Sequence, residues 1–449
     1  MHSSSHQPIG LYVHVPFCVS KCAYCDFASY AGREADVPRY VDAVIREITR
    51  RGAETGHPTA DTIFLGGGTP SLLDEGQATR ILDALDEAFP IRDCPGIEKP
   101  EKGCRRRLQT PIAVGQCRQS ATGVASYRFN GTTLSIPEGA EITCECNPGT
   151  LTTPFAQALR KAGVNRLSLG AQAKQTRLLR LLGRIHDWQQ VIDSVEIARE
   201  AGFDNINLDL MLGLPGGGKG DRLLLCEAPG GPFRQKVPVP FSAPQTATDL
   251  RETLEAAIAL SPTHLSCYSL MVEEGTPICR DIAAGKLALP DEGIDRDMYE
   301  LARQTLAEHG FQQYEISNFA REGYACRHNI GCWTRVPYLG FGCAAHSFFG
   351  ECRTMNPSKL DAYLAGEEPK TEHISKEKAR FESMMLGLRM TCGVKDEDFT
   401  RMHGMRIREA FAEKLDKPIG GGLLEWHEGA LRLTRLGMDL ENSVLVDLM

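Results

Sequence analysis

The fold of this chain is decided by the stretch Pro16-Phe17-Cys18-Val19-Ser20-Lys21-Cys22-Ala23-Tyr24-Cys25-Asp26-Phe27. Three cysteines in it, Cys18, Cys22 and Cys25, have a C-x3-C-x2-C spacing and follow a short alternating strand. Thiolates this close in sequence can hold one inorganic centre without ligands from distant loops. A [4Fe–4S] cluster usually takes four cysteines. Three cysteines leave one iron with an open coordination position. A reactant can bind there, as it does at the open position of a catalytic zinc site. The spacing therefore predicts an iron–sulfur cluster with one open iron.

Two other interpretations of the three thiols are a zinc knuckle and a set of buried thiols without metal. A zinc knuckle pairs two C-x2-C units or adds a pair of histidines, and neither follows nearby. The iron–sulfur interpretation is therefore favoured over both.

The cysteine loop resembles the cluster loop of the radical S-adenosylmethionine (SAM) superfamily. Its flanking residues, from Tyr12 to Cys18 and from Cys25 to Phe27, resemble one branch of it. That branch contains the oxygen-independent coproporphyrinogen III oxidases and the heme chaperones of the HemW type. Further motifs of the branch follow in the expected order over most of the chain: Gly66-Gly67-Gly68-Thr69-Pro70, Glu145-Cys146-Asn147-Pro148-Gly149-Thr150, Gly183-Arg184-Ile185-His186, Asp209-Leu210-Met211-Leu212-Gly213-Leu214-Pro215, and His328-Asn329 before Trp333.

Length and composition set further bounds. A chain of 449 residues favours one large domain and a smaller one. The net charge of −8 argues against a general nucleic-acid partner. We expect no transmembrane segment, because no run of 18 apolar residues occurs. The first six residues do not resemble a signal peptide, and sixteen cysteines then indicate a reducing compartment, the cytoplasm by default.

Short apolar strands alternate with amphipathic helices up to about residue 273. The pattern predicts strands at 10–16, 61–66, 140–146, 164–171, 204–213 and 263–272. It predicts helices at 35–51, 75–89, 154–162, 188–201 and 247–260. Five helical crossovers between six strands predict an α/β fold, an open (β/α)6 partial barrel of the TIM type. The resemblance implies the same fold.

Two helix starts carry capping signals. Thr153 before Pro154 predicts an N-cap followed by proline at the first helical position. Asp187 stands three residues before Gln190, a variant of the capping box.

Strand alternation predicts which side chains face the barrel interior. Leucines of the strand 204–213 should face the outer helices, which turns Asp209 inward. The same reasoning turns Glu145, Gln172, Tyr12 and His14 inward from three other strands. A polar interior is costly unless its groups are paired. It therefore indicates a ligand cavity, the alternative being an internal hydrogen-bond network without a ligand.

The resemblance implies a set of SAM contacts. The glycine loop after the second strand is expected at the amino-acid part of SAM, because backbone without Cβ atoms approaches a ligand closely. Asp209 and Glu145 suit ribose hydroxyls or the ammonium group, and Arg184 suits the carboxylate. Gln172 stands before Ala173 and Lys174, where the family usually has Ser and Phe. The expected SAM contacts are Tyr12, Gly67, Gly68, Thr69, Glu145, Gln172, Arg184 and Asp209.

Two segments depart from the barrel pattern. Residues 94–134 and 216–244 show no sustained periodicity and are interpreted as irregular insertions, loops or disorder. Cys94, Cys104 and Cys117 lie in the first without short-range metal spacing, so we expect no structural role for them. The second follows the Asp209 strand and would crowd the site if ordered.

Residues 291–374 are expected to form a post-barrel extension rich in glycine and aromatic residues. HemW-type chains usually read His-Asn-x-x-Tyr-Trp here, and this chain has Cys332 at the Tyr position. His328 and His346, expected at the barrel mouth, are candidate heme or substrate contacts, although a lone histidine is more often structural. Cys332 is a candidate thiolate ligand to heme iron.

The last segment, 375–449, is predicted to be a small α/β domain after the barrel domain 1–290 and the extension. Its stripe of apolar residues, Phe381, Met384, Met385 and Leu388, predicts a core-facing helix. A hairpin around Glu428-Gly429 and a final helix from about Leu436 resemble a winged helix. With 12 Lys and Arg against 13 Asp and Glu it does not fit a phosphate-binding surface, and we interpret it as a lid or partner surface.

Two functions stay open at this stage. In the coproporphyrinogen oxidases a fourth cysteine stands two residues after the third, and here that position is Phe27, which cannot ligate iron. This favours a HemW-type protein that binds heme and passes it to recipient hemoproteins. The alternative is an oxidoreductase that uses an electron donor and SAM to decarboxylate two propionates of coproporphyrinogen III. A radical SAM enzyme acting on another substrate is a third interpretation.

Overall fold

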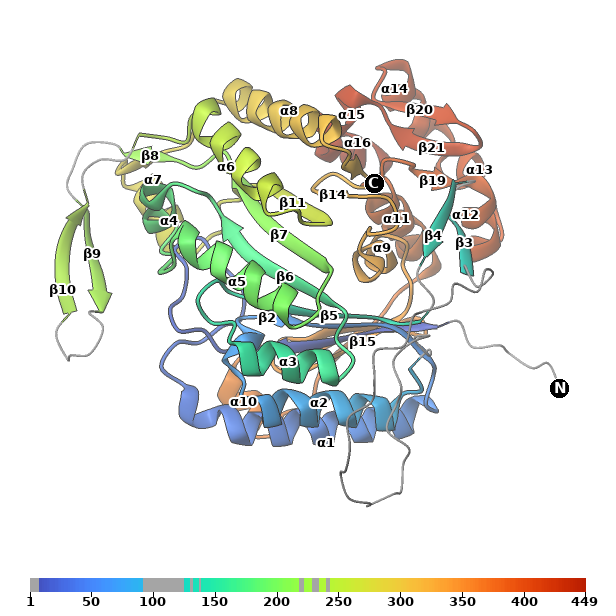
Figure 1. Ribbon diagram of the computed structural model, residues 1–449. Helices are drawn as coiled ribbons and strands as arrows, with labels where there is room; N and C mark the ends of the chain where they lie inside the picture. The colour runs from blue at the N-terminus through green and yellow to red at the C-terminus, as the bar shows by residue number, and fades with distance from the viewer. Residues whose placement is uncertain are drawn as a thin grey trace, which may run out of the picture.

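The computed structural model describes residues 8–91, 125–129, 132–136, 139–217, 222–227, 234–239 and 243–449. Within them a 12-stranded sheet runs through the molecule, and a smaller α/β unit lies at the C-terminal end (Figure 1). Among the described helices, none is both long enough and apolar enough to cross a bilayer.

Six parallel strands alternate with helices in the first part of the sheet. The strands are β1 (Ile9–Val15), β2 (Ala60–Gly67), β5 (Glu141–Cys146), β6 (Arg166–Gln172), β7 (Asn205–Leu212) and β11 (His264–Ser269). The helices between them are α1 (Val37–Thr55), α2 (Glu75–Ala88), α3 (Thr153–Lys161), α4 (Thr176–Leu181), α5 (Trp188–Glu200) and α6 (Ala247–Ala259), with the one-turn helices η1 (Glu34–Asp36) and η2 (Pro70–Leu72). All six predicted strands and five predicted helices are confirmed, and the short helices η2 and α4 were not foreseen.

The six strands lie in the order β11-β7-β6-β5-β2-β1, and the barrel does not close. The free side of β1 pairs instead with a later parallel strand, β15 (Tyr338–Phe341). The predicted open (β/α)6 arrangement is therefore present, with its first strand covered by the extension.

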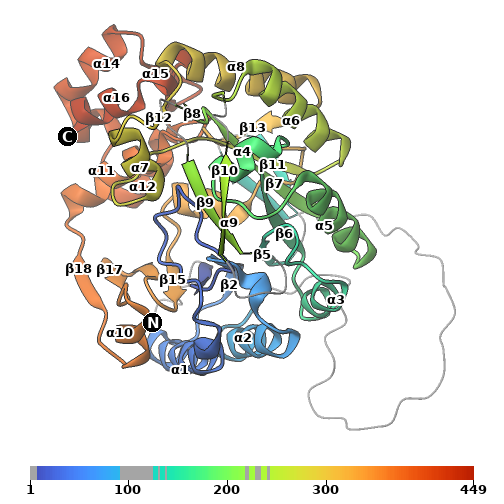
Figure 2. The ribbon, with the colours of Figure 1, turned by 90° about the vertical axis from the view of Figure 1, so that its left-hand side faces the viewer.

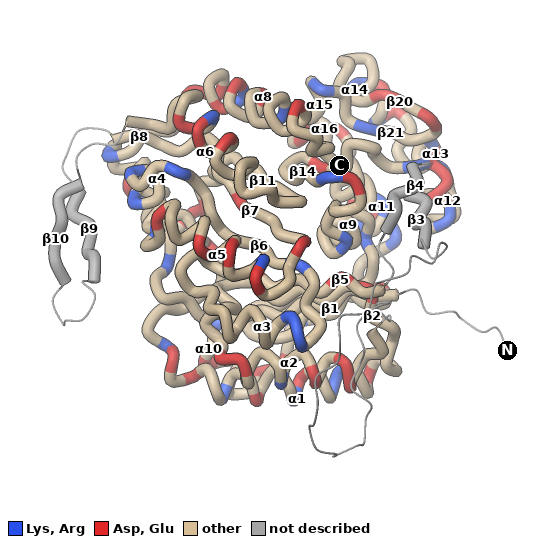
Figure 3. Tube along the Cα trace, viewed as in Figure 1, with Lys and Arg blue, Asp and Glu red and all other residues tan. Residues whose placement is uncertain are grey.

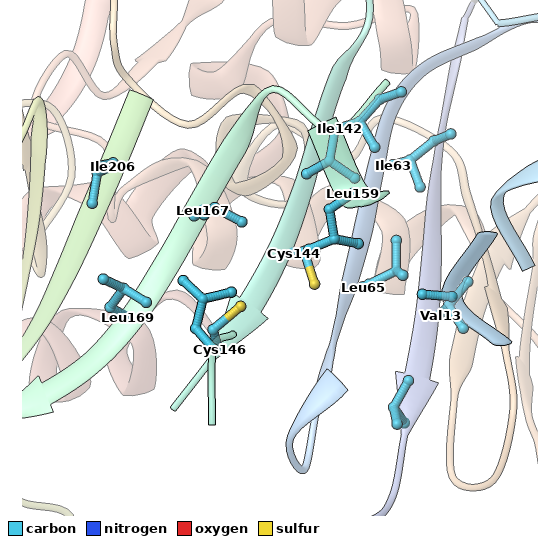
Figure 4. Close-up of a cluster of buried hydrophobic side chains, with 14 of the residues drawn as sticks. Val13, Ile63, Leu65, Ile142, Cys144, Cys146, Leu159, Leu167, Leu169 and Ile206 are labelled. Atoms are coloured by element: carbon cyan, nitrogen blue, oxygen red, sulfur yellow. The ribbon is translucent and has the colours of Figure 1, made fainter. Parts of the chain in front are cut away.

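The main core lies between the outer face of these strands and their helices (Figure 4). Leu167, Leu169, Ile206 and Leu208 are buried there. Cys144 and Cys146 point the same way, as the alternation of the strand predicted. The polar residues of the same strands are left to face the interior.

Helix capping matches one prediction and corrects the other. Asp187 and Gln190 form the capping box at the start of α5. At α3 the N-cap is Thr152, not Thr153, because the Thr152 hydroxyl accepts from the backbone N–H of Phe155. Thr152 has the extended backbone that an N-cap needs, and Pro154 lies one position further into the helix than predicted.

The two insertions are not loops throughout, contrary to the prediction. The first contains the hairpin β3 (Ala125–Phe129) and β4 (Thr132–Ile136), and the second contains β9 (Arg222–Glu227) and β10 (Arg234–Val239). Strands this short do not stand out in a periodicity window of about 11 residues or more. A further short strand, β8 (Gly216–Gly217), pairs with β12 (Leu287–Ala288). Cys94, Cys104 and Cys117 lie outside the described residues.

The extension continues the same sheet on both sides. Its strands are β13 (Gln312–Gln313) and β14 (Asn318–Ala320) beside β11, and β15, β16 (His346–Phe349), β17 (Cys352–Met355) and β18 (Lys370–His373) beside β1. Its helices are α8 (Glu292–Glu308), α9 (Arg327–Trp333) and α10 (Leu360–Leu364), and α7 (Pro277–Ala283) precedes it.

The C-terminal unit has a core of its own, formed by residues between Met384 and Leu448. Its elements are α11 (Lys376–Gly387), β19 (Val394–Lys395), α12 (Asp396–His403), α13 (Ile407–Phe411), η3 (Ala412–Leu415), α14 (Asp416–Gly420), β20 (Leu424–His427), β21 (Ala430–Leu433), α15 (Arg435–Asp439) and α16 (Glu441–Leu448). The predicted hairpin is confirmed: Glu428 and Gly429, both with positive φ, make its turn.

Both charge signs are interspersed over the C-terminal unit (Figure 3). The unit lies against α8, as both ribbon views show (Figures 1 and 2). Arg435 forms an ion pair of 2.6 Å with Glu300 of α8, and Arg296 of α8 forms one of 2.8 Å with Asp439. Partly exposed pairs of this kind contribute about 1 kcal/mol or less each. These ion pairs therefore orient the C-terminal unit on α8 and add little to the stability of the fold.

Candidate functional site

The cysteine loop and the glycine loop lie against each other at the carboxyl ends of β1 and β2. The Gly68 N–H donates to the carbonyl of Val15, the last residue of β1, over 2.8 Å. Tyr30 closes the cysteine loop from its far end, donating its N–H to Pro16 and accepting from the N–H of Cys18. In α/β proteins of this class the carboxyl ends of the strands form the active site.

The three thiols are partly buried and face donors from other loops. The Thr69 hydroxyl lies 3.6 Å from Cys18 Sγ, and Arg184 Nη1 lies 3.5 Å from Cys22 Sγ. Burial raises the pKa of the Cys18 and Cys25 thiols. Each thiolate of a four-iron cluster binds a different iron, so its ligands need not converge on one point. Three partly buried thiols on one loop are a donor set that fits such a cluster.

Arg184 connects the cysteine loop to the barrel interior. Its Nη2 donates to Asn147 Oδ1 over 2.9 Å and to the carbonyl of Gly170. Its Nε is buried without a partner among the described residues. A buried guanidinium with an unused donor beside the thiols is suited to bind a carboxylate.

Asn147 is a site residue that the sequence indicated only as a member of the motif after Glu145, with no role of its own. Its Nδ2 donates to Thr69 Oγ1 over 2.7 Å, while its Oδ1 accepts from Arg184. It thus joins the glycine loop to the arginine. Its place in the motif that follows Glu145 was the only sequence signal for this role.

Two carboxyl groups, Glu145 and Asp209, lie half-buried in the interior. Glu145 accepts from the Gly67 N–H over 3.0 Å, and Asp209 accepts from Asn207 over 2.7 Å. Burial, reinforced by the charge of Asp209, raises the pKa of Glu145 from 4.5 to about 8; the Gly67 amide and Arg166 oppose the rise. Burial also raises the pKa of Asp209. Such a pair favours a ligand that brings hydroxyl groups or a positive charge.

Gln172 and Tyr12 complete the polar interior. Gln172 is a buried non-glycine residue with φ 64° at the end of β6, where the pairing with β7 shifts register. A side chain in this strained region indicates a position fixed by function or packing. Tyr12 lies two residues before His14 on β1, and the two side chains are hydrogen-bonded over 2.9 Å.

His328 does not lie at the barrel mouth, contrary to the prediction, and Cys332 lies on the same helix, α9. His328 lies near the amino end of β2, where its Nδ1 is 2.9 Å from Thr62 Oγ1 and its ring stacks on Phe64. The motif alone says nothing about which end of the barrel α9 covers. Glu141 settles the matter, because at the start of β5 it accepts the backbone N–H groups of Arg327 and His328, both over 3.0 Å.

A pocket with a cavity volume of about 70 Å³, open to solvent on one side, lies at this end. Its wall includes Ile9, Ile330 and Val336, together with Arg327, His328 and Cys332. Burial lowers the pKa of His328 to about 4 and raises the pKa of Cys332 to about 11. His346 does not line this pocket and lies exposed on β16. The structure thus brings together two of the three candidate heme residues.

Family comparisons match both units. The family model of the Radical SAM superfamily matches residues 12–227, and that of the HemN C-terminal domain matches residues 374–440. The heme chaperone HemW of Bacillus subtilis is 32% identical over 439 residues, covering 96% of this chain and 97% of that protein. HemW of Escherichia coli is 30% identical over 446 residues, covering 98% and 97%. HemW of Mycobacterium tuberculosis is 29% identical over 448 residues, covering 98% and 94%.

One solved structure resembles the whole chain. Coproporphyrinogen III oxidase (HemN) of Escherichia coli, a radical SAM enzyme, matches with a TM-score of 0.71 over 99% of this chain and 90% of that chain. At 21% identity this likeness establishes the fold alone. It confirms the predicted α/β fold with an open barrel.

Proposed function

This chain belongs to the HemW family within the radical SAM superfamily, and from that premise we propose that it binds heme and passes it to recipient hemoproteins. The radical SAM domain implies a [4Fe–4S] cluster and SAM. We assign the cluster to Cys18, Cys22 and Cys25. When bound and reduced, such a cluster supplies the electron that cleaves SAM to methionine and a 5′-deoxyadenosyl radical.

The proposal gives the interior side chains separate tasks toward SAM. Arg184, with its unused Nε, takes the carboxylate. Glu145 and Asp209 take the ammonium group or the ribose hydroxyls. Backbone of the glycine loop approaches the ligand closely. The remaining residues assigned to this site are Tyr12, Gly67, Gly68, Thr69 and Gln172.

One observation favours heme transfer over an enzymatic reaction on the tetrapyrrole. The His328 pocket and the cysteine loop lie at opposite ends of β1. The pocket includes Ile9, and the loop follows Val15. Seven strand residues span about 20 Å at roughly 3.3 Å each. Reacting atoms must approach to about 3–3.5 Å. A tetrapyrrole in the pocket would therefore be out of reach of a radical formed at the cluster.

We assign the heme to this pocket. His328 is neutral at physiological pH because burial lowers its pKa to about 4, and neutral imidazole is a heme ligand. Cys332 would be the alternative ligand to the heme iron, as a thiolate. Arg327 is suited to a propionate, although Asp61 already contacts it over 2.8 Å. His346 has no part in this assignment.

Two kinds of protein partner follow from the proposal: an electron donor for the cluster and hemoproteins that accept the heme. The proposed compartment is the cytoplasm, because cluster thiolates must stay reduced before the cluster is assembled.

The second candidate function is that of a coproporphyrinogen III oxidase, the activity named for the protein whose structure shares this fold. The test is to reconstitute the cluster without oxygen, add SAM and a reductant, and offer coproporphyrinogen III. A parallel sample receives hemin alone. We expect stoichiometric heme retention and no decarboxylation. Protoporphyrinogen formed over many turnovers would overturn the carrier proposal.

A further inference from the structure

A single buried imidazole, His14, touches three parts of the SAM site. The residue is 6% exposed and lies on β1, four positions before Cys18. Its Nε2 is 2.9 Å from the carbonyl oxygen of Ala28, which follows the cysteine loop. Its Nδ1 is 2.9 Å from the hydroxyl of Tyr12.

The partners fix the tautomer of the ring. A carbonyl oxygen only accepts, so Nε2 carries the hydrogen that binds Ala28. In a neutral ring Nδ1 then has a lone pair, and it must accept the hydroxyl hydrogen of Tyr12. Burial lowers the pKa of His14, which keeps the ring neutral. Tyr12 therefore has its hydrogen committed to His14 and can only accept a hydrogen bond from a ligand.

The glycine loop packs on the same ring. Gly67 has φ 108°, and a Cβ at this position would overlap the His14 imidazole. Behind the ring, the buried hydroxyl of Tyr40 donates to the His14 carbonyl over 2.5 Å. The imidazole is thus held in one place, between the glycine loop and the end of the cysteine loop.

We propose that His14 is a positioning residue that sets Tyr12, the glycine loop and the cysteine loop relative to one another, so that Tyr12 meets the ligand as an acceptor. His14 does not itself bind iron or SAM. The proposal concerns the SAM site and is independent of heme binding, so either can fail without the other.

Two amide substitutions separate the two hydrogen bonds of the ring. In His14→Gln the amide nitrogen takes the place of Nε2 and keeps the bond to Ala28, but nothing accepts from Tyr12. In His14→Asn the amide oxygen takes the place of Nδ1 and keeps the hydrogen bond from Tyr12. The hydrogen bond to the Ala28 carbonyl, which holds the end of the cysteine loop, is lost. The matched control is His57→Gln, since His57 also binds a backbone carbonyl, that of Ala88, away from the site.

The readouts are the affinity for SAM, from its effect on the EPR spectrum of the reduced reconstituted protein, and the rate of iron loss to a chelator. His14→Gln should weaken SAM binding about tenfold, the scale of one buried hydrogen bond, with iron loss close to wild type. His14→Asn should speed iron loss about tenfold, with the smaller effect on SAM affinity. Tyr12→Phe should match His14→Gln, and combining the two should cost no more than either alone.

The reverse pattern, or wild-type behaviour of both His14 variants, would overturn the proposal. A folded His14→Gln protein that binds no cluster would also overturn it, because this variant keeps the bond to Ala28 that should preserve the cluster. Should both His14 variants fail to fold, Tyr12→Phe alone decides, since unchanged SAM affinity there contradicts the acceptor role.

Discussion

At the scale of single residues, motifs identified what the site is made of but not where every part lies. The cysteines, the glycine loop and Glu145 come together as expected, because each follows or ends a barrel strand, and Arg184 reaches them from the loop after α4. His328 was placed at the wrong end of the barrel. Its position depends on a hydrogen bond to Glu141, 187 residues away in sequence, which no local pattern reveals.

Cys22→Ala should prevent assembly of a stable [4Fe–4S] cluster while leaving the fold intact, because two thiolates cannot hold the cluster. Iron content should fall from about four per chain to a small fraction, measured by chemical analysis and by the EPR spectrum of the reduced protein. The matched control is Cys279→Ala on α7, next to Ile278, whose N–H donates to Ala23 of the cysteine loop. A full cluster spectrum in Cys22→Ala would contradict the ligand assignment.

The variant Glu145→Gln tests the raised pKa of this carboxyl group through the pH dependence of the free energy of unfolding. In the folded, ligand-free protein the pKa is about 8 against 4.5 ordinarily, so between these values the fold holds a proton that the unfolded chain has released. Stability therefore falls as pH rises from about 5 to 8. Each unit of pKa difference corresponds to about 1.4 kcal/mol. Glutamine never ionises, so urea unfolding at several pH values should show a shallower decline in the variant.

The control for this pH dependence is Glu87→Gln on the exposed face of α2. In this control variant, stability should fall with rising pH as steeply as in the wild-type protein. An identical slope in wild type and Glu145→Gln would mean that Glu145 is ionised in the fold throughout this range.

At the scale of elements, alternation and capping predicted the barrel because both are local. Strands buried on one face and helices with one apolar stripe recur in sequence with their own periods. The N-cap of α3, predicted at Thr153 but found at Thr152, shows the limit of local signals. Two adjacent threonines give the same capping signal, and only the backbone geometry distinguishes them. The short hairpins of the insertions were not predicted, because a strand of five or six residues gives too few repeats of the alternating pattern.

Glu141→Gln should weaken heme binding about tenfold without affecting the cluster. The Glu141 carboxylate accepts two N–H groups at the start of α9, and such a cap contributes about 1–2 kcal/mol. Loss of its charge should loosen the helix that carries His328 and Cys332. Hemin titration followed by the Soret band measures the effect, and Glu377→Gln in the exposed first turn of α11 is the control. Unchanged heme affinity in Glu141→Gln would mean that α9 does not form part of the heme site, contrary to the prediction.

At the scale of the whole molecule, one sheet joins two sites that face opposite ways. The cysteine loop lies at the carboxyl ends of β1 and β2, and the His328 pocket lies at their amino ends. The C-terminal unit is attached through α8 by partly exposed ion pairs. Composition and motifs could predict the units, but not that β15 covers β1 and builds the pocket wall with α9, because that pairing joins residues more than 300 positions apart.

The separation of the two sites is tested most directly by hemin titration of three proteins: wild type, cluster-free Cys22→Ala, and the double variant His328→Gln, Cys332→Ser. We predict one heme per chain with the same dissociation constant in wild type and Cys22→Ala, and binding at least about tenfold weaker in the double variant. Loss of heme binding in Cys22→Ala, with full binding in the double variant, would place the heme at the cysteine loop and contradict the account.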